Sequence, residues 1–163
     1  MGDGRVGGTA MSLLPVGRPA PDFESTDADG RVVRLRDYRG RPVVLYFYPE
    51  DDTPGCTREA CAFRDDIDAF RSKGAVVLGV STQDEASHLA FRDRYALNFP
   101  LVADADKQIT RAYGALGFLG LAHRVTYVID GEGTIVGSFR RLDPKSHSQE
   151  ALRILSRLEV RHP

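Results

Sequence analysis

The order of apolar and polar positions predicts a chain that alternates strands and helices. Residues 43–48 form a continuous run of β-branched and aromatic side chains, and residues 75–81 form a second apolar run. Runs of this kind are typical of strands that are covered on both faces. Residues 54–72, between the two runs, place apolar side chains at spacings of three and four, which predicts an amphipathic helix. A strand–helix–strand unit of this length indicates two parallel strands joined by a right-handed crossover.

The rest of the pattern adds shorter elements on both sides of this unit. Before the unit, strands are predicted at 22–25 and 31–35 around an Asp-Gly turn. After it, the pattern predicts a helix begun by Thr82, with Glu85 in a capping box, then a short edge strand at 99–102 and a short helix at 106–113. Antiparallel strands at 124–130 and 134–139 and a last helix at 148–158 complete the chain. A βαβ unit followed by a ββα unit is the thioredoxin-like plan. We therefore expect an α/β protein with a central mixed sheet flanked by helices, an N-terminal strand extension and an inserted helix.

Length and composition fit one domain and exclude two classes of partner. The chain has 163 residues, with 42% hydrophobic and 28% charged side chains, which is ordinary for a globular protein. We expect a single domain at residues 11–163, preceded at residues 1–10 by a Gly-rich natural tail or an added extension. With 22 basic against 23 acidic residues, no basic field exists to hold a nucleic acid. The longest apolar runs are too short to span a membrane.

The chain has two cysteines, Cys56 and Cys61, which are too few for a disulfide framework. Residues 1–10 lack the apolar core of a secretory signal, so we expect a cytoplasmic address. In a reducing compartment a close cysteine pair is more often catalytic or redox-sensing than structural. No set of His and Cys has metal-ligand spacing, so we expect no metal and no other cofactor. His88 is interpreted as a packing or surface residue, and His147 is given no role because it lies near the terminus.

Cys56 stands at the predicted start of a helix, just past the end of a central strand, where open α/β sheets place their sites. Thr53 is a good N-cap and Pro54 suits the first helical position. The backbone N–H groups of that first turn and the helix dipole favour an anion, hence the thiolate, and Arg58 adds positive charge nearby. A buried, inert thiol is the alternative, and it fits a capped helix start poorly. Three acidic residues argue against a second anion unless they point into solvent: Glu50, Asp51 and Asp52.

Cys61 lies beside the apolar stripe of the same helix, in line with Asp65 and Asp68 on its polar side. The stripe itself consists of Ala60, Phe63, Ile67 and Phe70. Cysteines are usually buried, so a cysteine on the wetter side indicates either disulfide exchange or a tolerated small residue. Both interpretations stay open from the residues alone.

Pro49, Thr53 and Cys56 form the pattern Pro-x-x-x-Thr-x-x-Cys, and Cys61 follows five residues later. This segment resembles the active site of the peroxiredoxins, in particular the subfamily called bacterioferritin comigratory protein or peroxiredoxin Q. The flanking sequences resemble that subfamily as well, from about residue 15 to residue 139. They include Arg124, which opens the segment Val-Thr-Tyr-Val-Ile-Asp.

The resemblance implies a thiol-dependent peroxidase acting on hydrogen peroxide and organic hydroperoxides. Cys56 would be the peroxidatic residue, oxidised to a sulfenic acid, and Cys61 would resolve it as an intramolecular disulfide. The Thr53 hydroxyl, the Cys56 backbone N–H and the Arg124 guanidinium are the candidate donors to the leaving oxygen, and Pro49 would shield the sulfur from water. The alternative for Arg124 is a surface salt bridge. Thioredoxin or a glutaredoxin-like dithiol would reduce the disulfide, and the protein is expected to be a monomer or a weak dimer.

The spacing of the two cysteines also predicts a change of shape. Five residues of α-helix turn through about 500° and rise roughly 7.5 Å, which sets the two Cα atoms roughly 8–9 Å apart. A disulfide needs Cα atoms within about 7 Å. We therefore expect oxidation to unwind the first turns of the helix at 54–72.

Two other classes of function remain. A thiol–disulfide oxidoreductase acting on proteins normally uses Cys-x-x-Cys, and the longer spacing between Cys56 and Cys61 counts against it. A non-enzymatic redox sensor or binding module could reuse the same fold. The loop residues Phe118, Leu119 and Leu121 could line a substrate wall, form a partner surface or be covered core.

Overall fold

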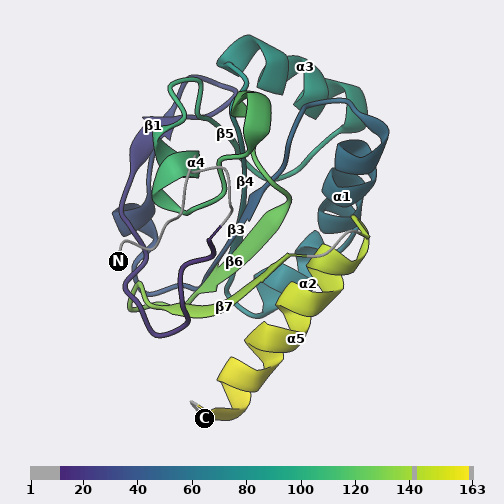
Figure 1. Ribbon diagram of the computed structural model, residues 1–163. Coiled ribbons are helices and arrows are strands. Elements are labelled where there is room, and N and C mark those ends of the chain that lie inside the picture. The colour runs from purple at the N-terminus through teal and green to yellow at the C-terminus, as the bar shows by residue number, and fades with distance from the viewer. Residues whose placement is uncertain (1–11, 141–142, 162–163) are drawn as a thin grey trace, which may run out of the picture.

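The computed structural model describes residues 12–140 and 143–161, and these contain a five-stranded mixed sheet flanked by helices (Figure 1). The strands follow the order β5-β4-β3-β6-β7, where β3 is parallel to β4 and antiparallel to β6. Their bounds are β3 Val43–Phe47, β4 Val76–Ser81, β5 Leu101–Ala103, β6 Val125–Ile129 and β7 Ile135–Arg140. The predicted α/β architecture with a central mixed sheet is therefore confirmed. The tail predicted at residues 1–10 lies outside the described residues.

Helices cover both faces of the sheet unequally. The helices are α1 Pro54–Asp65, α2 Ile67–Ser72, α3 Glu85–Tyr95, α4 Gln108–Ala112 and α5 Ser146–Arg161. Figure 1 shows α1, α2 and α5 together on one side of the sheet, with α4 on the other side near the N-terminal strands. None of the helices in the described part of the chain is both long and apolar enough to cross a membrane.

The central strand β3 is buried along its whole length, as its continuous apolar run predicts. Val44 and Tyr46 point into the core under α1, α2 and α5, and the ring of Tyr46 stacks on Phe63 of α1 with centroids 4.4 Å apart. Leu45 and Phe47 point into the second core, with α4 and the N-terminal segment. The position of α1 is thus fixed by its apolar stripe on one face of this strand.

The N-terminal strand extension forms a sheet of its own. β1 Glu24–Thr26 pairs antiparallel with β2 Val32–Arg34, and the Asp-Gly turn between them has Gly30 at a φ of 77°. The side chain of Asp27 accepts the N–H groups of Asp29 and Arg31, which closes that turn.

The single helix predicted at residues 54–72 is wrong, because the structure divides it into α1 and α2 at Asp66. Asp66 has φ −95° and ψ 6°, outside regular helical geometry. Its carboxylate accepts hydrogen bonds from Ser148 at 2.8 Å and Gln149 at 3.1 Å, both on α5. Asp66 therefore joins the break to the C-terminal helix.

The capping box predicted at Thr82 is also wrong. The N-cap of α3 is Asp84, whose side chain accepts the N–H of Ser87 at 2.9 Å. The Thr82 hydroxyl instead donates to the carbonyl of Gly120 at 2.9 Å, in the loop before β6. The last helix is longer than predicted, since α5 begins at Ser146.

Candidate active site

The candidate site forms where β3 ends and β6 begins. Phe47 of β3 pairs with Val125 of β6, so the loop that follows β3 lies beside the residue that precedes β6. That residue is Arg124, and the loop leads into α1, where Cys56 is the third residue. Antiparallel pairing thereby brings together two residues that are far apart in the sequence.

Cys56 is buried, with 1% of its surface exposed, and Arg124 donates from Nη2 to its Sγ at 3.5 Å. A Cβ added to Gly55 would come within 3.1 Å of that same Nη2, so this glycine makes room for the guanidinium. Arg58, expected to supply positive charge, is exposed. The positive charge beside the sulfur comes from Arg124.

Glu59 is a site residue that sequence reasoning missed. It is fully buried, and its Oε1 accepts from Arg124 Nη1 at 2.6 Å, so one guanidinium bridges a thiol and a carboxyl group. Burial raises the pKa of Glu59 to about 8, against the opposing effect of Arg124. Within residues 12–140 and 143–161 its Oε2 accepts no hydrogen bond, which agrees with a cost of burial that exceeds the gain from the ion pair.

Arg124 therefore combines the two roles expected as alternatives, because its salt bridge lies inside the site. Its side chain is 18% exposed, and that of its partner Glu59 is fully buried. Burial lowers the pKa of Arg124, but Glu59 and Cys56 raise it more, so the guanidinium keeps its charge.

His147, to which the sequence assigns no role, lies behind Glu59. It is fully buried at the start of α5, with Nδ1 2.7 Å from Thr126 Oγ1 and 3.4 Å from Glu59 Oε2. The sequence carries a signal for the burial of Glu59, though not for that of His147. Glu59 is three residues after Cys56 and four before Phe63, which places its side chain on the buried stripe of α1.

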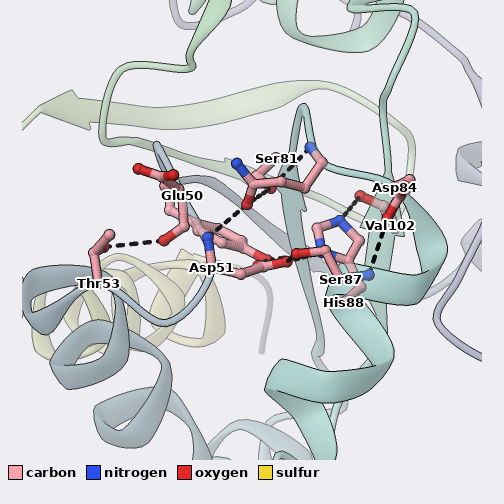
Figure 2. A network of polar contacts seen from close by, with 10 residues as sticks. Glu50, Asp51, Thr53, Ser81, Asp84, Ser87, His88 and Val102 are labelled. Atoms are coloured by element: carbon pink, nitrogen blue, oxygen red, sulfur yellow. Dashed lines mark hydrogen bonds and ion pairs between the residues drawn. The ribbon is translucent and has the colours of Figure 1, made fainter.

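Thr53 occupies the N-cap position of α1, as predicted, but its side chain makes no capping hydrogen bond. Its hydroxyl donates instead to the carbonyl of Glu50 at 3.0 Å (Figure 2). The backbone carbonyl of Thr53 accepts the N–H of Thr57 at 2.8 Å and closes the first turn. Pro49 is half-buried in the same loop, and its shielding role stays a prediction.

The acidic residues of the loop do not share one orientation. Glu50 is exposed, whereas the Asp51 side chain is 5% exposed and is bound by Tyr48, directly after β3, and by side chains of α3. Asp52, at a φ of 62°, accepts from Arg94 at 2.6 Å and from Tyr95 at 2.8 Å, both on α3. Both aspartates are thus tied to α3.

Cys61 is half-buried on the polar side of α1, as its position beside the stripe predicts. It lies in the wall of a shallow groove between α1 and the start of α5, lined also by Thr57, Arg58, Ala62, Asp65, Asp66, Lys145, Ser148 and Gln149. Cys56 and Cys61 are both free thiols within one regular helix. The unwinding on oxidation stays a prediction.

The loop before β6 is not covered core. Phe118 and Leu119 are 73% and 81% exposed, and Leu119 has a φ of 66°. Leu121 is half-buried. A substrate wall and a partner surface remain the two interpretations of these residues.

Comparisons with known proteins agree on one family. The model of the AhpC/TSA family matches residues 16–138. The chloroplastic peroxiredoxin Q of Oryza sativa subsp. japonica is 43% identical over 145 residues, which cover 87% of this chain and 67% of that protein. Peroxidoxin BcpB of Mycobacterium tuberculosis has a similar structure, with a TM-score of 0.84 and 33% identity over 89% of this chain and 98% of its own. The structure of bacterioferritin comigratory protein from Xanthomonas campestris, which was studied for its alkyl peroxide reduction activity, is also similar. Its TM-score is 0.80 and its sequence identity 29%, over 91% of this chain and 99% of its own.

Proposed function

This chain belongs to the AhpC/TSA family and is a peroxiredoxin with a thioredoxin-like fold and thiol-dependent peroxidase activity, and we propose that Cys56 is its peroxidatic residue and Cys61 its resolving residue. The observation that carries this proposal is the Arg124 guanidinium, which contacts the buried Cys56 Sγ at 3.5 Å and Glu59 at 2.6 Å. A permanent positive charge beside a buried sulfur favours the thiolate, the reactive form of cysteine.

In the first step the Cys56 thiolate attacks the nearer oxygen of a hydroperoxide. The S–O bond forms as the O–O bond breaks, the sulfur is oxidised to a sulfenic acid, and the leaving oxygen takes up a proton as water or an alcohol. Arg124 and the Cys56 N–H would stabilise the charge that develops on that oxygen. The Thr53 hydroxyl donates to Glu50 in this structure, so it must rotate before it can donate to a bound peroxide.

In the second step the Cys61 thiolate attacks the sulfenic sulfur, releasing hydroxide that is protonated to water and forming a disulfide. Both residues lie in the regular helix α1, so the bond requires that this helix unwind. A thioredoxin-like dithiol would then reduce the disulfide by two exchange steps and become a disulfide itself. Cys61 is accessible to such a partner because it is half-buried at a groove.

The test is turnover coupled to thioredoxin, thioredoxin reductase and NADPH, with hydrogen peroxide and an alkyl hydroperoxide measured side by side. Peptide mapping of the oxidised chain should yield a Cys56–Cys61 disulfide and no other. A protein disulfide reductase would instead reduce insulin faster than it consumes peroxide. Peroxide consumption without a mapped disulfide would contradict the resolving role of Cys61. A monomeric state and a cytoplasmic address stay predictions.

A further inference from the structure

Asp51, in the loop before α1, is held by polar groups from several elements (Figure 2). Its Oδ1 accepts from the Tyr48 hydroxyl at 2.7 Å, and its Oδ2 accepts from the Ser87 hydroxyl at 2.6 Å. His88 Nδ1 lies 2.7 Å from that same Oδ2. The backbone N–H of Asp51 donates to the side chain of Gln83 at 2.5 Å. Peroxide chemistry at Cys56 gives no direct role to this cluster, although it is built around a fully buried histidine.

The hydrogen bonds of His88 join the active-site loop to β5 through α3. Its Nε2 lies 3.1 Å from the carbonyl oxygen of Val102 on β5, and a carbonyl can only accept, so Nε2 carries a proton. A neutral ring would then point the lone pair of Nδ1 at the carboxylate of Asp51. Because that contact is 2.7 Å long, a proton must lie between the two atoms.

Other groups hold the carboxyl group of Asp51 in place. Its two oxygens accept from the hydroxyls of Tyr48 and Ser87. Burial, and then the charge of Asp51, raise the pKa of Tyr48 well above its usual value, so that hydroxyl keeps the proton it donates. Asp51 and His88 therefore form a hydrogen-bonded pair that is buried between the active-site loop and α3.

We propose that His88 is a positioning residue for peroxide reduction: through its hydrogen bond with Asp51, it fixes the loop that places Cys56 against Arg124. The inference rests on the peroxidatic role proposed for Cys56. The loop is held from Asp51 and Asp52 on one side and enters α1 through the Thr53 carbonyl on the other.

The connection from His88 to the sulfur runs through the backbone. Arg124 is held by a different part of the fold, since it directly precedes β6. A shift of residues 51–53 therefore changes the distance between Cys56 Sγ and the guanidinium. Misplacement of a reacting group by about 1 Å can cost a factor of about 100 in rate.

Two amide substitutions separate this role from simple packing. His88→Asn puts an amide nitrogen where Nδ1 lies and keeps a donor to Asp51, whereas His88→Gln reaches the Val102 carbonyl and loses that donor. We expect His88→Gln to slow the oxidation of Cys56 about tenfold or more, and His88→Asn to retain most of the rate. Leu89→Gln, at the neighbouring exposed position of α3, is the control and should match the parent chain.

The rate is measured in single turnovers with hydrogen peroxide, by rapid quenching, thiol alkylation and mass spectrometry. The measurement uses the full chain, which has no tryptophan to report by fluorescence. Unfolding in urea is followed by circular dichroism for each variant. If His88→Gln oxidises as fast as the parent, or faster than His88→Asn while both remain folded, the positioning role is wrong.

A second measurement reads the ring directly and needs no variant activity. In the parent chain labelled with ¹⁵N-histidine, NMR should show Nε2 of His88 protonated, as its contact with the Val102 carbonyl requires, with the signal assigned by its loss in His88→Asn. An unprotonated Nε2 would overturn the proposal. If Cys56 of the parent chain does not react with peroxide at all, the proposed function fails, whereas the state of the His88 ring is still read separately.

Discussion

The two cysteines lie five residues apart on the same helix, yet their surroundings differ in almost every respect. Cys56 is 1% exposed and faces the sheet, where the guanidinium of Arg124 touches its sulfur. Cys61 is half-buried and lies in the wall of a groove lined largely by polar side chains. One helix thus holds a buried sulfur beside a fixed positive charge and a second sulfur that lies open to a groove.

The difference follows from helical geometry. A rotation of 100° per residue sends residues 56, 59, 60 and 63 toward the sheet and turns residue 61 toward solvent and the start of α5. The sheet side supplies a fixed charge in a dry environment, where electrostatic interactions are strong. On the outer side Cys61 is half-buried at a groove, where the proposed reductant could reach it.

The largest effect is expected from Cys56→Ser. Serine has no thiolate to attack the O–O bond, so peroxide consumption should fall to background with either peroxide. The loss should be complete even in a single turnover, because the Arg124 guanidinium lies beside Cys56 and not beside Cys61. Stopped-flow or quenched peroxide assays measure it, and urea unfolding checks that the variant is folded. Substantial residual turnover would show that the reacting sulfur has been misassigned.

Cys61→Ser should separate the two steps. One equivalent of peroxide should still react at the parent rate, because the surroundings of Cys56 are untouched, while thioredoxin-coupled turnover should be lost. The sulfenic acid at Cys56 should persist or oxidise further, which mass spectrometry detects as added oxygen. The matched control is Ala62→Ser, which introduces the same side chain next to Cys61. Unchanged coupled turnover in Cys61→Ser would mean that another thiol resolves the sulfenic acid.

Arg124→Ala tests the electrostatic half of the comparison. Removing one preorganised donor from a reacting centre typically costs a factor of about 100 to 1,000, and we expect a loss of that size in the peroxide step. The resolving step should change less, since Cys61 faces the groove on the outer side of α1 and not this guanidinium. Arg71→Ala, a change of an exposed arginine on α2, is the control for lost charge. A folded Arg124→Ala variant with the parent rate would mean that Arg124 has no role in catalysis and serves only in the salt bridge with Glu59.

The smallest effect is expected in the pH dependence of stability. The folded chain keeps a proton on Glu59 up to a pKa of about 8, whereas the unfolded chain releases it near the usual glutamate pKa of 4.5. Stability from this group is therefore full below about pH 4.5 and is lost as the pH rises toward 8. Glu59→Gln, which keeps an acceptor for Arg124, should flatten this slope in urea unfolding between pH 5 and 8. Equal slopes in the two proteins would mean that Glu59 is ionised in the folded chain.

Much of the fold follows from local patterns in the sequence. The apolar runs at 43–48 and 75–81 and the hairpin after Arg124 predict the central strands within one or two residues. The break at Asp66 could not be predicted, because neither proline nor glycine marks it and its partners lie on α5. The cap of α3 was misplaced since Thr82 and Asp84 are both good N-cap residues, and a contact with the distant Gly120 engages Thr82.

Some residues of the candidate site could also be predicted from the sequence, and others could not. Cys56, Cys61 and Thr53 lie in one short segment, so a sequence pattern can identify them. Glu59 and Asp51 were missed because a carboxylate near a helix start normally faces water and interacts with the helix dipole. Their burial depends on Arg124 and His88, and only the packing of β6 and α3 against α1 and its loop brings those partners close.

The interruption at Asp66 limits α1 to twelve residues, from Pro54 to Asp65, and this length has a consequence for timing. Helical segments of about 20 residues relax between helix and coil in about 0.1–1 μs, whereas enzymes commonly turn over about 1–1,000 times per second. If α1 opens and re-forms once per catalytic cycle on that timescale, the refolding occupies about a thousandth of the cycle or less. Substitutions that weaken or strengthen α1 would then change the fraction of molecules caught open at any instant, without lengthening the cycle through slow refolding.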